Sequence, residues 1–184
     1  ADAHMPLHTS DNHDGQNTNQ KGIHSLWESR LPELFAKDYK LNVPQGKYLE
    51  NVDQAIWDLM FDTHSLVKPL LAADKKLRIA TAENKMYVTD ANGVVLKNKY
   101  GGELYSDEYA AKFHKELNGM VENQIKKAIT VTASFWHTAW VNAGKPDLSK
   151  LDTKELTNRN RKFLKKDLKT FEDGKLFGLI YDKE

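Results

Sequence analysis

The stretch that decides the fold is SDEYAAKFHKELNGMVENQIKKAITVTASFWHTAWVN, residues 106–142. Mostly apolar side chains recur along it every three or four residues, which places them on one face of a helix. They are Tyr109, Phe113, Leu117, Met120, Val121, Gln124, Ala128, Val131, Phe135 and Thr138. Ser106 is a suitable N-cap, and Gly144 and Pro146 are stop signals. The pattern predicts one helix of about 36 residues, a spine against which others pack.

Two earlier segments show the same helical spacing. The first covers residues 23–37, with Pro32 as a break or kink. The second covers residues 48–71, and Pro69 should bend or end it. The fold class predicted from these segments is mainly α.

One short segment departs from the helical pattern. Residues 86–89 and 94–96 are β-prone runs on either side of Asp90-Ala91-Asn92-Gly93. Asn-Gly between such runs is typical of a tight turn that joins antiparallel strands. We therefore expect one small β-hairpin in the otherwise helical chain.

The composition changes after Pro146. Residues 147–184 hold ten Lys and Arg and eight Asp and Glu, with a helical pattern over 153–169 and an apolar end at 176–181. We expect a helical domain over residues 1–149 and a charged, partly helical tail over 150–184. The basic cluster at 159–166 is either a solvated helix face or a contact for phosphate-bearing partners.

The composition excludes several classes of protein. The chain has 184 residues, with 27 Lys and Arg against 26 Asp and Glu, 40% hydrophobic residues and no Cys. Without Cys there are no disulfides, thiolate nucleophiles or Cys-ligated metal sites. A net charge of +1 argues against a globally basic nucleic-acid surface. No apolar run approaches the roughly 18 residues of a membrane helix, so we expect no transmembrane segment.

Carboxylates and imidazoles gather in the first 28 residues. They are Asp2, His4, His8, Asp11, His13, Asp14, His24 and Glu28. His24 and Glu28 are four residues apart, so on a helix they share one face. With His8 they could reach one zinc ion at about 2.0–2.2 Å. Spacing alone leaves two alternatives open: a metal site, or a solvated ion pair on a helix face.

The sequence around these residues resembles the zinc-dependent phospholipase C family, whose superfamily includes the single-strand-specific nucleases. Residues 2–8 read DAHMPLH and residues 19–28 read NQKGIHSLWE. They are similar to a family pattern of His-x-x-x-Asp, five residues, His, a polar loop, and then His-x-x-x-Asp or Glu. Trp57, Ser65 and the stretches 117–121 and 135–140 resemble its bacterial branch. The likeness covers residues 1–149 and implies a multi-helical orthogonal array of the phospholipase C/nuclease type.

The resemblance implies a role for four residues. His8, His24 and Glu28 would bind one zinc ion, and Asp2 would serve a neighbouring zinc pair as a bridging, catalytic carboxylate. The family holds three zinc ions, which activate water for attack on phosphorus. The implied substrate is a phosphodiester, either a phospholipid or single-stranded nucleic acid. Family members are typically exported, to the periplasm or the extracellular space.

The family pattern also implies ligands that would lie ahead of residue 1. A His four residues before Asp2, and further ligands of the zinc pair, would precede this sequence. We therefore expect the C-terminal portion of such an enzyme, with ligands for one zinc ion and weak or no activity alone. The alternative is a non-catalytic helical zinc-binding or interaction module derived from the family.

Other side chains in these stretches are expected to be structural. We expect His4 to be exposed or to stand behind the ligands. Trp27 should pack behind the ligands. His137 lies in an aromatic stripe with Trp136, which is typical of a core position.

Overall fold

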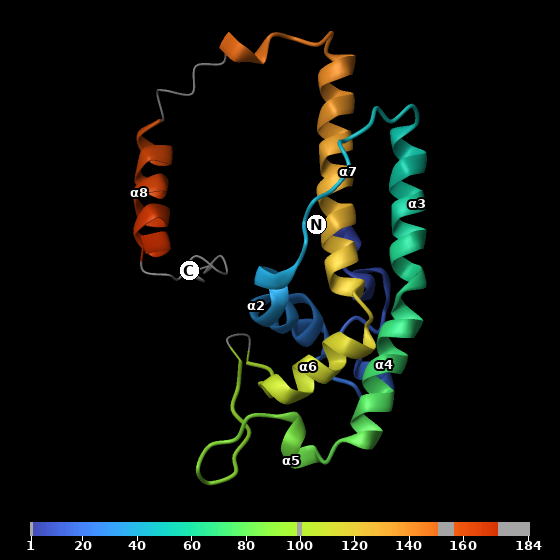
Figure 1. The fold of residues 1–184 in the computed structure, drawn as a ribbon, viewed down its shortest axis with the longest axis vertical. Coiled ribbons are helices and arrows are strands. Elements are labelled where there is room, and N and C mark those ends of the chain that lie inside the picture. Colours follow the sequence, from blue (N-terminus) through green and yellow to red (C-terminus); the bar gives the residue numbers. More distant parts are fainter. Residues whose placement is uncertain (1, 99–100, 151–156, 173–184) are drawn as a thin grey trace. The chain divides into compact units, whose positions relative to one another are not determined.

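The computed structural model describes residues 2–98, 101–150 and 157–172, and these are mainly helical (Figure 1). The expected mainly α class is therefore confirmed. Contacts divide the chain into two compact units, Ala1–Asn142 and Ala143–Glu184. This division falls shortly before Pro146, where the composition changes. In the described ranges no helix combines the length and the apolar character needed to cross a membrane.

Short helical turns open the first unit. In chain order they are the 3₁₀ turns Asp2–His4, Pro6–Thr9 and Gln16–Thr18, α1 (Ile23–Ser25), a π-helical turn (Leu26–Arg30), α2 (Leu31–Phe35) and the 3₁₀ turn Ala36–Asp38. The helical segment expected over 23–37 is present, but its irregularity precedes Pro32. The N–H of Leu31 bonds to the carbonyl of Leu26, five residues back. This wider turn comes just before Pro32, which has no N–H to continue an α-helical ladder.

The segment expected as one helix over 48–71 is two helices, α3 (Val52–Ser65) and α4 (Val67–Ala80). The break lies at Leu66, whose N–H bonds to the carbonyl three residues back at 3.1 Å. Pro69 lies in the first turn of α4, where a missing N–H costs little. The prediction that Pro69 bends or ends the helix is therefore wrong, because the break comes before it at Leu66 and α4 continues through Pro69 to Ala80.

The predicted spine of about 36 residues is also two helices, α6 (Asp107–Glu116) and α7 (Met120–Asn142) (Figure 1). Ser106 caps α6 as expected, because its hydroxyl accepts the N–H of Tyr109 at 3.2 Å. Asn118 and Gly119 separate the helices with φ of 47° and 77°. Both residue types tolerate this left-handed conformation, which ends a right-handed helix. The single-helix prediction is therefore wrong.

The segment between α5 (Glu83–Met86) and α6 contains antiparallel pairing. It consists of isolated bridges rather than regular strands in the described residues: Tyr87 to Tyr105, Thr89 to Val95, and Lys97 to Glu103. The expected turn is present at Asp90, whose N–H bonds to the carbonyl of Val94 at 2.9 Å. Gly93 supplies the positive φ, 80°, that this turn requires.

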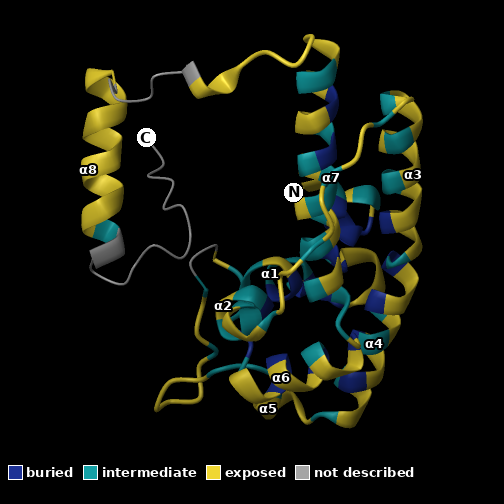
Figure 2. Cartoon of the chain, turned by 45° about the horizontal axis from the view of Figure 1, so that its top comes forward, coloured by how far each residue is buried: buried dark blue, intermediate teal, exposed yellow. Residues whose placement is uncertain are grey.

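The core of the first unit lies where the N-terminal turns meet α4 and α6. Figure 2 shows buried positions on these helices and on α7. The buried apolar side chains are Met5, Leu7, Ile23, Leu26, Trp27, Leu31, Val67, Leu70, Leu77, Tyr105, Tyr109, Ala110, Phe113, Leu117 and Val121. Trp27 is among them, which places a packed side chain between the two helical residues expected to bind metal. Residues 4–7 are thus buried in the first unit.

The far half of α7 packs differently from the prediction. Trp136 is 75% exposed and His137 is also exposed, so the aromatic stripe is not core. The buried positions are Ser134 and Thr138, whose hydroxyls accept backbone N–H groups of the extended segment 39–51. Extended backbone without a partner strand needs such acceptors. The inward-facing side chains in this part of α7 are therefore hydrogen-bonding hydroxyls rather than apolar groups.

The second unit contains a 3₁₀ turn, Leu148–Lys150, and α8 (Asn158–Glu172). The helix expected over 153–169 is thus observed from residue 158, and residues 153–156 of that prediction lie outside the described part. The apolar end predicted at 176–181 also lies outside it.

His114 on α6 gives the first unit a predictable response to acid. Its ring lies against Phe35 and Tyr39, and its Nε2 is 3.0 Å from the hydroxyl of Tyr39. Burial lowers the pKa of His114, and Glu122 only partly opposes this. Because the unfolded chain then binds the proton more readily, stability present above pH 6.5 should be lost as the pH falls.

We expect His114→Gln to weaken this acid dependence. The test is urea unfolding at a series of pH values on both sides of pH 6.5. The variant should show a shallower fall of unfolding free energy toward low pH than the parent protein. His137→Gln, at an exposed position, is the control. Parallel curves for His114→Gln and the parent would contradict the assignment.

Candidate metal centre

His8, His24 and Glu28 converge from three short elements. They lie in the 3₁₀ turn Pro6–Thr9, in α1 and in the π-helical turn, respectively. Nε2 of His24 is 3.2 Å from Nε2 of His8 and 2.8 Å from Oε2 of Glu28. Nε2 of His8 is 3.8 Å from the same carboxylate oxygen. The three side chains thus bring one potential ligand atom each within 4.8 Å of one another.

Backbone carbonyls orient both imidazoles. Nδ1 of His8 is 3.1 Å from the carbonyl oxygen of Asp2, and Nδ1 of His24 is 2.8 Å from that of His13. When Nδ1 carries the proton and donates it to a carbonyl, Nε2 keeps its lone pair for a metal ion. Ligand histidines in metalloproteins are held in this way. The sequence pattern did not reveal either carbonyl, because any residue type provides one.

Asp14 shapes the loop that carries His24 into place. Its Oδ1 accepts the N–H of Gly22 at 3.0 Å and the N–H of His24 at 3.3 Å. Gly22 has φ of 90°, which favours glycine. A Cβ at Gly22 would also lie 3.3 Å from the ring of Tyr105. The carboxylate and the glycine together fix the start of α1, and His24 with it. In the sequence, Asp14 stands out only as one of the carboxylates in the first 28 residues.

The π-helical turn sets the position of Glu28. Such turns occur mostly as single wide turns within helices and are frequent at functional sites. The N–H of Leu31 closes the turn on the carbonyl of Leu26. Trp27, within the same turn, is 5% exposed, so packing holds the segment from behind. Glu28 itself faces outward toward the two histidines.

The charges of the group are coupled. The hydrogen bond between His24 and Glu28 holds the pKa of Glu28 below its usual range, and the same bond raises the pKa of His24. Without a metal ion, the pair is therefore an ion pair when His24 is protonated. A zinc ion must displace that proton, so zinc binding should release it.

Asp2 does not join this group through its side chain. Among the described residues, only His8, His24 and Glu28 form a set of three or more candidate ligands within 4.8 Å of one another. The backbone carbonyl of Asp2 contacts His8, and its carboxylate is exposed. Its predicted role as a ligand of neighbouring ions stays a prediction.

His4 differs from the expectation of an exposed or supporting position. It is 6% exposed, and neither ring nitrogen has a hydrogen-bond partner among the described residues. Its carbonyl accepts the side-chain amide of Gln124 at 2.9 Å. Burial lowers the pKa of His4, which favours the neutral ring. The expected exposed position is therefore wrong, because the 3₁₀ turn Asp2–His4 carries the His4 ring into the interior of the first unit.

An open cavity of about 800 Å³, lined mainly by polar and charged residue types, borders the candidate ligands. His24 and Glu28 form part of its wall, together with Lys21 and Ser29. His13 also lines it, with its ring edge-on to that of His24 at 5.7 Å. The lining thus holds one cationic residue and several hydrogen-bond donors, and also the acidic residues Asp14 and Glu28. An anionic ligand in this cavity would therefore depend on the charge of a bound metal ion.

Comparison with known proteins gives no assignment. No family model matches the chain, and neither a curated protein nor a solved structure is significantly similar to it.

Proposed function

We propose that this chain carries a zinc site of the phospholipase C-like phosphodiester hydrolases. His8, His24 and Glu28 would hold one ion, and Asp2 would serve neighbouring ions. The observation that supports the proposal most directly is the convergence of two Nε2 atoms and one carboxylate oxygen within 4.8 Å. The resemblance of residues 2–8 and 19–28 to the family pattern supports the same assignment, and with it a family-type helical array and export.

The donor set fits zinc. Zinc is bound by imidazole nitrogens and carboxylate oxygens, and catalytic sites keep one position open beside three protein ligands. When bound, the ion would acidify a water molecule and polarise a phosphoryl oxygen. The chain's own contribution is to fix both rings through the carbonyls of Asp2 and His13.

The adjacent cavity supports a phosphodiester as substrate. Lys21 places a positive charge on the same wall as His24, and Ser29 adds a hydroxyl. A phosphodiester carries one negative charge, which Lys21 and a bound zinc ion together would balance beside the acidic residues Asp14 and Glu28. Both a phospholipid head group and a single-stranded nucleic acid offer this chemistry.

The proposal predicts one zinc ion per chain and an open coordination position. Zinc titration by calorimetry should give a stoichiometry near one. In the cobalt-substituted protein, dimethyl phosphate should change the visible absorption spectrum, because the ester enters the open position. Hydrolysis of bis-p-nitrophenyl phosphate by these 184 residues should stay at background.

Three outcomes would contradict parts of this proposal. No zinc binding, with a melting temperature unaffected by chelator, would reject the metal site. Zinc binding with a cobalt spectrum insensitive to dimethyl phosphate would indicate a closed, structural ion and so the non-catalytic alternative. Robust, chelator-sensitive hydrolysis would contradict the expectation that one ion is insufficient.

A further inference from the structure

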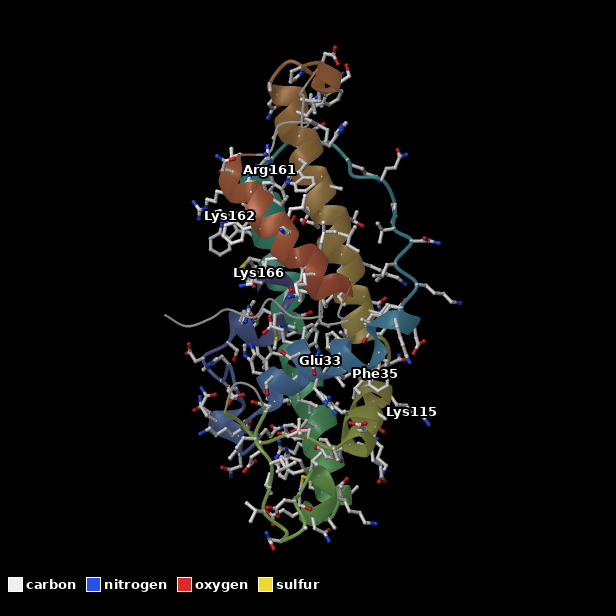
Figure 3. All side chains as sticks on the ribbon, turned by 90° about the vertical axis from the view of Figure 1, so that its left-hand side faces the viewer. Glu33, Phe35, Lys115, Arg161, Lys162 and Lys166 are labelled. Carbon is white, nitrogen blue, oxygen red and sulfur yellow. The ribbon has the colours of Figure 1, made fainter. Side chains whose placement is uncertain are left out.

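Helix α8 carries two opposite faces of different chemistry. Leu164 and Leu168 are four residues apart and 45% and 51% exposed. Lys162, Lys166 and Lys169 follow a spacing of four and three residues, and at 100° per residue they lie on the opposite side. Figure 3 labels two of these lysines, Lys162 and Lys166, along the helix.

Basic residues dominate the helix. It contains six Lys and Arg against two acidic residues. The basic residues are Arg159, Arg161, Lys162, Lys165, Lys166 and Lys169. The guanidinium of Arg159 lies 5.7 Å from the ring centre of Phe163, which is 52% exposed and lies closer around the helix to Lys166 than to the two leucines. The helix is thus amphipathic, strongly basic and low in overall hydropathy.

We propose that α8 binds the surface of an anionic lipid bilayer. A helix of this kind lies in the plane of the membrane interface, with its apolar face at the boundary between head groups and acyl chains. Leu164 and Leu168 would enter that boundary, and the lysines would remain at the level of anionic head groups. The inference rests on α8 alone and holds whether or not the metal site is catalytic.

An anionic lipid bilayer is the one of three candidate partners that would contact both the apolar and the basic face of α8. A nucleic acid would use the basic face but would leave Leu164 and Leu168 in water. A second copy of α8 would cover the leucines but would bring two strongly basic helices together, which is unfavourable. An anionic bilayer satisfies the charge and the apolar face at once.

Co-sedimentation of the full chain with vesicles tests the role of charge. We expect binding to vesicles of phosphatidylcholine with about one-third phosphatidylserine, little binding to phosphatidylcholine alone, and loss at high salt. Lys162→Glu with Lys169→Glu should reduce the partition coefficient about tenfold or more. Lys68→Glu with Lys75→Glu on α4 is the matched control, because it makes the same charge change at the same spacing on exposed positions. Equal losses for both pairs, or no binding by the parent protein, would overturn the proposal.

A second pair of variants tests insertion of the apolar face. Leu164→Gln with Leu168→Gln keeps the charge and a good helix propensity, and it should lower vesicle binding several-fold. Ile79→Gln, at a position 81% exposed on α4, is the control. Binding of single-stranded DNA that is as strong as vesicle binding, and unaffected by the leucine variants, would assign α8 to nucleic acid instead. Vesicle binding unaffected by them would also overturn the proposed insertion.

Discussion

Replacing His24 by alanine is expected to weaken zinc binding by more than about 100-fold. Loss of a residue that only supports a ligand costs up to about 100-fold in metal affinity, and loss of the ligand itself should cost more. His24 is the central member of the group, since its Nε2 lies within 3.2 Å of both other ligand atoms. Without it, His8 and Glu28 offer only two ligands, 3.8 Å apart. A zinc ion held by two protein groups exchanges readily with solvent.

The effect is measured most clearly as a zinc-dependent change in stability. In the parent protein, free zinc at about 100 times its dissociation constant should add about 2.7 kcal/mol to the free energy of unfolding. His24→Ala should abolish this increment, and His137→Ala, at an exposed position on α7, should keep it. Each variant is compared with its own zinc-free form, because His24→Ala also removes the hydrogen bond to Glu28. An undiminished increment in His24→Ala would place the zinc elsewhere.

The members of the candidate site could be predicted because their chemistry is carried by residue type. A His and a Glu four residues apart meet on a helix whatever packs behind them, and the polar loop is long enough to return to His8. The supporting contacts could not be predicted. Asp14 and the carbonyls of Asp2 and His13 act through loop geometry, which periodicity does not describe.

The fold shows the same division between pattern and local geometry. Apolar periodicity located the helical segments but not their breaks, because the inner face stays continuous when a helix turns at Leu66 or Asn118. The signal at Asn118-Gly119 was present, since this pair favours left-handed backbone. Trp136 was misplaced for another reason: burial on α7 follows the hydroxyls of Ser134 and Thr138, which bond to an extended segment.

Asp74→Ala should be the most destabilising single change in the first unit, at about 3–5 kcal/mol. Asp74 is completely buried on α4. Its carboxylate accepts hydrogen bonds from Arg78 Nε at 2.6 Å, Gln20 Nε2 at 2.7 Å and the hydroxyl of Tyr109 at 2.8 Å. Alanine would leave the mostly buried guanidinium of Arg78 without this counter-charge and strand two further donors.

Asp74→Ala should also weaken zinc binding at the metal centre, because Gln20 links the loop before α1 to α4. Its side-chain amide also donates to the carbonyl of Leu71 at 2.8 Å. Urea unfolding measures the stability, and zinc titration of the folded fraction measures the site. Glu116→Ala, which removes the exposed ion pair with Lys76, should cost less than about 1 kcal/mol. Only the buried carboxylate of Asp74 joins three separate parts of the chain. Equal losses of unfolding free energy for Asp74→Ala and Glu116→Ala would therefore show that the buried network does not hold the unit together.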